Sequence, residues 1–166
     1  MRILIAGAWL AVALAAAAVL PAAGQGQDAG LTGIDKPGDV VQARQLLMDG
    51  IDEDMHDIDL AGTGQPIRLE DLKAHADRIS TLLTAFPHLF PPQTQPSPDA
   101  PVPTTASPAV WKEFADFYGR AAAAAKTALD ASQAGTLDQF KPLGTQLRAA
   151  CDGCHAKYMV VEQPKP

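Results

Sequence analysis

The stretch Cys151-Asp152-Gly153-Cys154-His155 decides how the rest of the chain is interpreted. It holds the only two cysteines among the 166 residues and lies close to the C-terminus. A C-x-x-C-H sequence is typical of covalent haem attachment, because each thiol can form a thioether with one vinyl group while the adjacent imidazole reaches the iron. On a helix, positions 151, 154 and 155 share one face. The motif predicts one haem c per chain, attached through Cys151 and Cys154, with His155 as the proximal iron ligand.

Three other interpretations of the motif are weaker. A redox-active C-x-x-C normally opens a helix after a strand in a βαβ unit, and this sequence has no such pattern. A structural zinc site usually has four ligands, whereas one C-x-x-C and His155 supply only three. A disulfide between cysteines one helical turn apart fits the geometry of that bond poorly.

The first 24 residues have the pattern of a secretory signal peptide. Arg2 gives a basic start, residues 3–20 are almost wholly apolar, and small residues follow. An uncleaved membrane anchor is the alternative, which the small residues and the lack of a basic stop disfavour. We therefore expect residues 1–24 to be removed, the mature protein to be periplasmic, and no stable membrane insertion to remain. Residues 25–38 are rich in Gly, Asp and Gln and are predicted to form a flexible segment.

Charge and composition restrict the partners and the fold class. The formal net charge is −6, and becomes −7 once a leader containing Arg2 is removed. This acidic balance argues against nucleic-acid binding and is compatible with a basic redox partner protein. Only 5% of residues are aromatic and alanine is abundant, which suits closely packed helices better than a sheet.

Four segments have apolar residues at alternating spacings of three and four, the pattern of helices packed in a bundle. We predict helices from Asp39, as N-cap, to about Ala61; from about Ile67 to Phe86; from about Pro108 to about Gly135; and from about Leu137 onward, with Pro142 as a potential kink or late start. The predicted inward positions are Val41, Arg44, Met48, Ile51, Met55 and Ile58; Leu69, Leu72, Ala76, Ile79, Leu83 and Phe86; Val110, Phe114, Phe117, Ala121, Ala124 and Ala128; and Leu137, Phe140, Leu147, Cys151, Cys154 and Tyr158.

A proline-rich connection over 87–108 separates the second and third predicted helices. It is long enough to cross the end of a bundle. The sequence therefore predicts an all-α protein, an antiparallel four-helix bundle over residues 39–166 with covalently bound haem near one end.

The chain resembles the class II c-type cytochromes, the cytochrome c′ and cytochrome c-556 family, over about residues 35–161. The residues that carry the resemblance are Arg44-Gln45 with Met48, Phe90-Pro91-Pro92, Val110-Trp111, and Cys151 to Tyr158. In ordinary small cytochromes c the haem motif lies near the N-terminus instead. The resemblance also implies that a homodimer through the first two helices could form.

Arg44 falls on the apolar stripe of the first predicted helix, where an arginine is rarely buried unless it is paired. A haem brings two propionates, and guanidinium binds carboxylates well. The resemblance implies that Arg44 binds a propionate, with Gln45 assisting. The alternative is that Arg44 lies at the edge of the stripe and extends to water.

Met48 decides between two functions. The resemblance implies that an apolar residue here leaves the iron five-coordinate, as in cytochromes c′, whereas a methionine ligates it, as in the c-556 type. Ligation by His155 and Met48 would raise the reduction potential and make an electron carrier. The alternatives are that Met48 only fills the core, or that Met55 supplies the sulfur. We expect an electron carrier and not an enzyme; the other candidate is a five-coordinate protein that binds NO or CO.

One position departs from the family pattern. A basic residue usually stands four positions after the proximal histidine, but here that position is Met159, with Lys157 nearer the motif. Trp111 and Tyr158 are expected in the haem pocket or the core. The remaining histidines, His56, His75 and His88, match no expected ligand site, and His75 is expected to face solvent.

Overall fold

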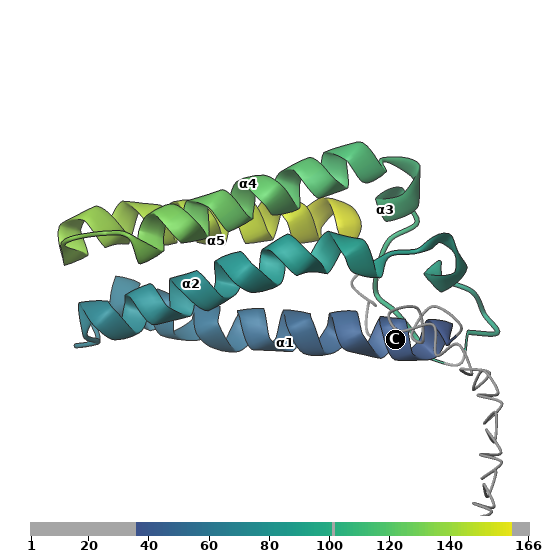
Figure 1. Ribbon diagram of the computed structural model, residues 1–166, viewed down its shortest axis with the longest axis horizontal. Helices are drawn as coiled ribbons and strands as arrows, with labels where there is room; N and C mark the ends of the chain where they lie inside the picture. Colours follow the sequence, from purple (N-terminus) through teal and green to yellow (C-terminus); the bar gives the residue numbers. More distant parts are fainter. Residues whose placement is uncertain (1–35, 101, 161–166) are drawn as a thin grey trace, which may run out of the picture.

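Four long helices form the body of the molecule. The computed structural model describes residues 36–100 and 102–160, so the predicted signal peptide lies outside the described residues. The long helices are α1 (Pro37–Gly62), α2 (Leu69–Ala85), α4 (Phe114–Ser132) and α5 (Leu137–Tyr158). They run antiparallel in a ring, with α1 against α2 and α5, and α4 against the same two helices (Figure 1). This confirms the predicted all-α four-helix bundle.

The connection between α2 and α4 crosses one end of the bundle. It contains two short 3-10 helices, η1 (Phe86–Leu89) and η2 (Pro92–Thr94), and the single-turn helix α3 (Ala109–Lys112). The start of α4 and the end of α5 lie at the same end as α3 (Figure 1). The connection therefore lies beside the haem motif.

Several predicted boundaries differ from the structure. The N-cap of α1 is Lys36, not Asp39, and Pro37 takes the first helical position, where its missing N–H is not needed. The third predicted helix is two helices, because the backbone breaks at Glu113 (φ −124°, ψ 38°). Pro142 does not delay α5, which starts at Leu137.

A variant of the capping box, in which the second bond comes from the residue before the N-cap, explains why α5 starts where it does. Thr136 Oγ1 accepts a hydrogen bond from the backbone N–H of Gln139 at 3.3 Å, and Gln139 Oε1 accepts from the backbone N–H of Gly135 at 2.9 Å. These reciprocal bonds satisfy donors that a helix start leaves unpaired. They fix the start of the helix that carries the haem motif.

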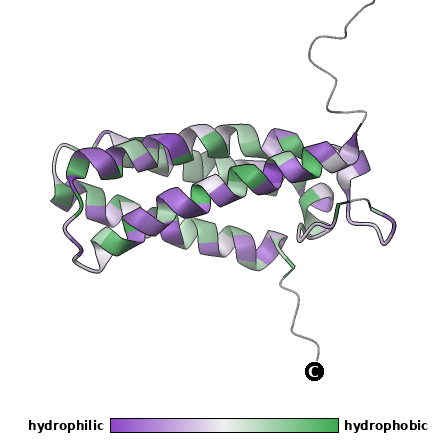
Figure 2. Cartoon of the chain, turned by 90° about the horizontal axis from the view of Figure 1, so that it is seen from below, coloured by the Kyte–Doolittle hydropathy of each residue, from purple (hydrophilic) through white to green (hydrophobic). Residues whose placement is uncertain are grey.

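Most predicted inward positions are buried, and along each helix hydrophobic and hydrophilic residues are interspersed (Figure 2). Two predictions were wrong: the exposed fractions are 40% for Phe114 and 37% for Leu137. Both residues are the first of their helices, where the helix does not yet pack closely against the neighbouring helices. Gly144 allows α5 to approach α1 closely, because a Cβ there would lie 3.0 Å from Ile58 Cγ2.

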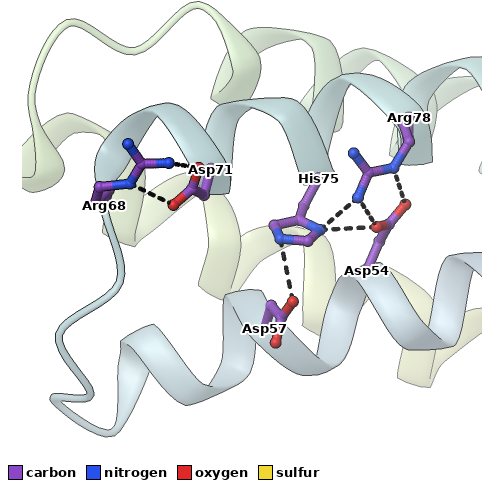
Figure 3. Close-up of polar contacts among 6 residues, drawn as sticks. All are labelled: Asp54, Asp57, Arg68, Asp71, His75 and Arg78. Carbon is purple, nitrogen blue, oxygen red and sulfur yellow. Dashed lines mark hydrogen bonds and ion pairs between the residues drawn. The ribbon is translucent and has the colours of Figure 1, made fainter.

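A polar cluster joins α1 to α2 (Figure 3). Asp54 is buried in α1 and accepts hydrogen bonds from Arg78 of α2. His75 Nδ1 lies 2.8 Å from Asp54 Oδ1, and its Nε2 lies 3.1 Å from Asp57 Oδ2. The expectation that His75 faces solvent was therefore wrong, because two carboxylates of α1 hold it in the interface.

Among the described residues, no helix is both long and apolar enough to cross a membrane.

Candidate haem site

A cavity of about 320 Å³ lies at the end of the bundle crossed by the connection. Residues from α1, α4 and α5 line it, together with Leu83 of α2, Phe86 of η1 and residues 104–106 of the connection. All six residues predicted from the sequence line this one cavity: Arg44, Gln45, Met48, Cys151, Cys154 and His155. Residues more than 100 positions apart in the sequence thus share one site.

The haem motif forms part of the final turns of α5. Cys151, Cys154 and His155 are half-buried and line the cavity. The two thiols are not joined in a disulfide.

The opposing wall belongs to α1. Met48 lines the cavity and is half-buried, whereas the other inward residues of α1 are at most 4% exposed. Met55 also lines the cavity, but it is 1% exposed and belongs to the central core. The apolar part of the lining includes small side chains from α4 and α5, namely Ala121, Ala124 and Ala150, beside the larger Leu83, Phe86 and Phe117.

Arg44 is 3% exposed, which excludes the alternative that it extends to water. Its guanidinium donates to Thr104 Oγ1 at 2.7 Å and to Thr94 Oγ1 at 3.0 Å, and more weakly to backbone carbonyls. It also lies 4.5 Å from the ring centre of Phe90. Burial lowers the pKa of Arg44 to about 10, which leaves it charged near neutral pH. Beside it, Gln45 Nε2 donates to Pro103 O at 3.0 Å.

Three arginines line the cavity, and two of them have carboxylate partners. Arg120 donates to Asp116 at 2.9 Å, and Arg148 donates to Asp59 at 2.5 Å. Arg44 bonds only to neutral oxygens within the described residues. It is therefore the buried cation at this site whose charge no carboxylate of the described chain balances.

The end of α5 is tied to both α4 and the connection. Lys157 Nζ lies 2.6 Å from Glu113 Oε2 and 2.9 Å from Asp116 Oδ2, so two carboxylates already balance the positive charge of Lys157. Met159, at the position where the family usually has a basic residue, is the C-cap that follows α5, and it pairs with Ala106 in an isolated antiparallel bridge. Because Glu113 and Asp116 hold the amine of Lys157, this lysine does not replace the basic residue that the family usually has at the position of Met159.

Sequence reasoning missed Asp116 and the 104–106 segment as parts of this region. Tyr158 and Lys157 both bond to Asp116 from 42 and 41 positions away. Lys157 and Tyr158, close behind the haem motif, indicate that a hydrogen-bond acceptor lies nearby. The sequence does not indicate which acidic residue is that acceptor. Trp111, expected in the pocket or core, donates from Nε1 to Phe90 O at 2.9 Å. His56, His75 and His88 do not line the cavity.

The residues present fit a haem c. Two thiols and an imidazole share one helical face, a thioether lies across the cavity on α1, and small apolar side chains leave room for a flat group. Arg44 adds a buried cation suited to a carboxylate. The chemistry of this donor set is that of a covalently attached haem.

Comparison with known proteins agrees with this fit. The family model described as Cytochrome C′ matches residues 39–159. Cytochrome c-556 of Agrobacterium tumefaciens (strain II Chrys) is 34% identical over 125 residues, which cover 71% of this chain and 94% of that protein. The crystal structure of cytochrome c′ from Rubrivivax gelatinosus has a TM-score of 0.65 at 29% identity, covering 74% of this chain and 96% of its own. A structure of oxidised cytochrome c556 from R. palustris shows the same fold, with a TM-score of 0.65 at 24% identity, over 75% of this chain and 98% of that one.

The resemblance predicted from the sequence is thus confirmed: the chain belongs to the cytochrome c′ family, in which haem c is bound covalently.

Proposed function

We propose that this protein carries single electrons on a haem c whose iron is held between His155 and Met48. The observation that carries the proposal is the position of Met48. It lines the same cavity as the haem motif, from the facing helix, and it is the inward residue of α1 that is only partly buried where it packs against the core. A methionine that only filled the core would be enclosed as Met55 is.

Haem c supplies the redox chemistry when bound, and the side chains set its conditions. Cys151 and Cys154 would hold the macrocycle, while His155 and Met48 would bind the iron. A thioether opposite an imidazole raises the reduction potential. The apolar side chains of the lining would cover part of the bound group and so reduce its contact with water.

Arg44 is proposed to bind a haem propionate, with Gln45 beside it. A buried guanidinium without a carboxylate partner is costly, and an anion in the cavity would relieve that cost. Because Arg120 and Arg148 already pair with carboxylates, Arg44 is the cation of the cavity that is free for this role. The hydrogen bonds from Arg44 to the connection hold its guanidinium in place before any anion arrives.

The optical spectrum of the haem-loaded protein tests the ligation. We expect a low-spin spectrum in both oxidation states, with the weak far-red sulfur-to-iron band in the oxidised form and no change with CO. Met48→Leu should abolish that band and make the reduced protein bind CO. Met55→Leu is the matched control, since it removes a thioether from the same helix and the same cavity, and it should leave the spectrum unchanged.

A high-spin wild-type spectrum that shifts with CO would contradict ligation by Met48. The protein would then act as the five-coordinate, NO- or CO-binding type of the same family. Loss of the far-red band in Met55→Leu but not in Met48→Leu would identify Met55, and not Met48, as the iron ligand.

The partner and the compartment are also part of the proposal. The acidic net charge of −6 favours a redox partner protein with a basic surface. Export through the predicted signal peptide would place the electron carrier in the periplasm.

A further inference from the structure

The final turn of α5 has hydrogen-bond and ion-pair partners outside its own helix. The last carbonyls of a helix have no partner within it, so the last turn tends to fray. Here that turn carries His155, Lys157 and Tyr158. The carbonyl of Tyr158 accepts a hydrogen bond from the backbone N–H of Ser107 at 2.8 Å, and the side chain is buried.

One carboxylate binds the side chains of this turn. Asp116 Oδ2, in the first turn of α4, accepts from the Tyr158 hydroxyl at 2.5 Å, from Lys157 Nζ at 2.9 Å and from Arg120 Nε at 2.9 Å. Lys157 also pairs with Glu113 at 2.6 Å. These five residues are called the Asp116 cluster below. The three donors keep the pKa of Asp116 far below its usual range, so it is an ionised and strong acceptor near neutral pH.

The Asp116 cluster adjoins the haem cavity. Tyr158 and Arg120 line the cavity together with His155. Tyr158 follows His155 by three positions and so lies on the same helical face. Its ring also packs edge-on against Phe117, with 5.2 Å between ring centres. A shift of the Tyr158 side chain would therefore move both the cavity wall and the turn that carries the histidine.

We propose that Asp116 is a positioning residue for His155. By holding Tyr158 and Lys157 against α4, it fixes the last turn of α5 and with it the orientation of the imidazole toward the bound group. The inference rests on the proposed role of His155 as an iron ligand and does not depend on Met48. An ion pair with a merely structural role would stabilise the fold without setting that orientation.

Two variants separate positioning from charge. Asp116→Ala removes the acceptor together with one negative charge, whereas Tyr158→Phe breaks the bond to Asp116 and leaves every charge in place. Asp130→Ala is the matched control on the same helix. Asp116 and Asp130 both have side chains that are 44% exposed, each forms an i,i+4 ion pair, and neither lines the cavity. They differ in that Asp116 bonds to Lys157 and Tyr158 of α5, whereas Asp130 bonds to Lys126 of its own helix.

The haem-loaded, oxidised proteins are compared by reduction potential and by the proton NMR shifts of the haem methyl groups, which depend on the orientation of the imidazole plane. We expect Asp116→Ala and Tyr158→Phe to move both quantities and Asp130→Ala to move neither. The double variant should show less than the sum of the single changes, because both remove the same interaction.

Methyl shifts that stay at the wild-type values in Tyr158→Phe would overturn the proposal, even if the potential of Asp116→Ala changed, because that pattern is a charge effect alone. Failure of the proposed function is seen separately. A high-spin wild-type spectrum would refute ligation by Met48, while the comparison among these variants would still report on His155.

Discussion

At the residue scale, Arg44 combines properties that rarely coincide. It is 3% exposed and charged, and within the described residues its partners are neutral. The guanidinium joins α1 to two separate points of the connection, Thr94 and Thr104, so it holds the covering of the cavity in place. Its side chain therefore has a structural role as well as the proposed role toward a propionate.

Replacing Arg44 with Met should lower the free energy of unfolding by about 3 kcal/mol, because hydrogen bonds to a buried charged group are lost and their acceptors are left without donors. Denaturant unfolding of the haem-loaded protein measures this. Arg68→Met is the control: its side chain is 81% exposed, and it should change stability by no more than about 0.5 kcal/mol. Equal stability of the two variants would show that the Arg44 contacts do not hold the connection.

At the scale of the elements, polar contacts decide how α1 and α2 meet. Asp54 is buried, accepts from Arg78 and lies 2.8 Å from His75 Nδ1, whereas Asp57 is 41% exposed and forms an ion pair with His75 (Figure 3). The two aspartates lie one turn apart on the same helix, so they form a natural pair for comparison.

Asp54→Ala should destabilise the protein by about 2 kcal/mol. The cost is below that of a fully buried pair, because Arg78 is 54% exposed and can turn to water. Asp57→Ala should cost less than about 1 kcal/mol. Thermal unfolding followed by far-UV circular dichroism gives both values, and a larger loss for Asp57→Ala would contradict the importance of burial here.

At the scale of the whole molecule, pH links the Asp116 cluster to stability. The pKa of Asp116 in the folded protein lies below its ordinary value of 3.8, first because of the Tyr158 hydroxyl and then because of Lys157 and Arg120. A carboxyl group with a depressed pKa stabilises the folded state above its unfolded pKa, and this contribution is lost as the pH falls toward the folded value.

We therefore expect the melting temperature to fall as the pH is lowered below about 4. In Asp116→Ala the fall should be smaller, because the group responsible is absent, although this variant starts from a lower melting temperature near neutral pH. Calorimetry over a pH series tests both expectations. A parallel decline in Asp116→Ala and in the wild type would show that other carboxyl groups cause the acid sensitivity.

The sequence alone determined the haem motif and the helical class, and the family resemblance indicated Arg44, Gln45 and Met48 as the residues that share the cavity with the motif. The motif and the class follow from local spacing: two cysteines and a histidine on one turn, and apolar residues every three or four positions. The break at Glu113 was beyond such reasoning, since the apolar spacing continues across it.

Only the tertiary structure decided which groups the polar side chains bind. Arg44 reaches residues 45 to 60 positions away, and Tyr158 reaches Asp116 across 42 positions. The position of His75 beside the apolar stripe of α2 predicted a side chain that faces solvent. In the structure, Asp54 and Asp57 of α1 hold it in the interface. Such pairings depend on how the helices are placed beside one another, because a hydrogen bond needs atoms within about 3 Å and spacing along one helix carries no information about the next.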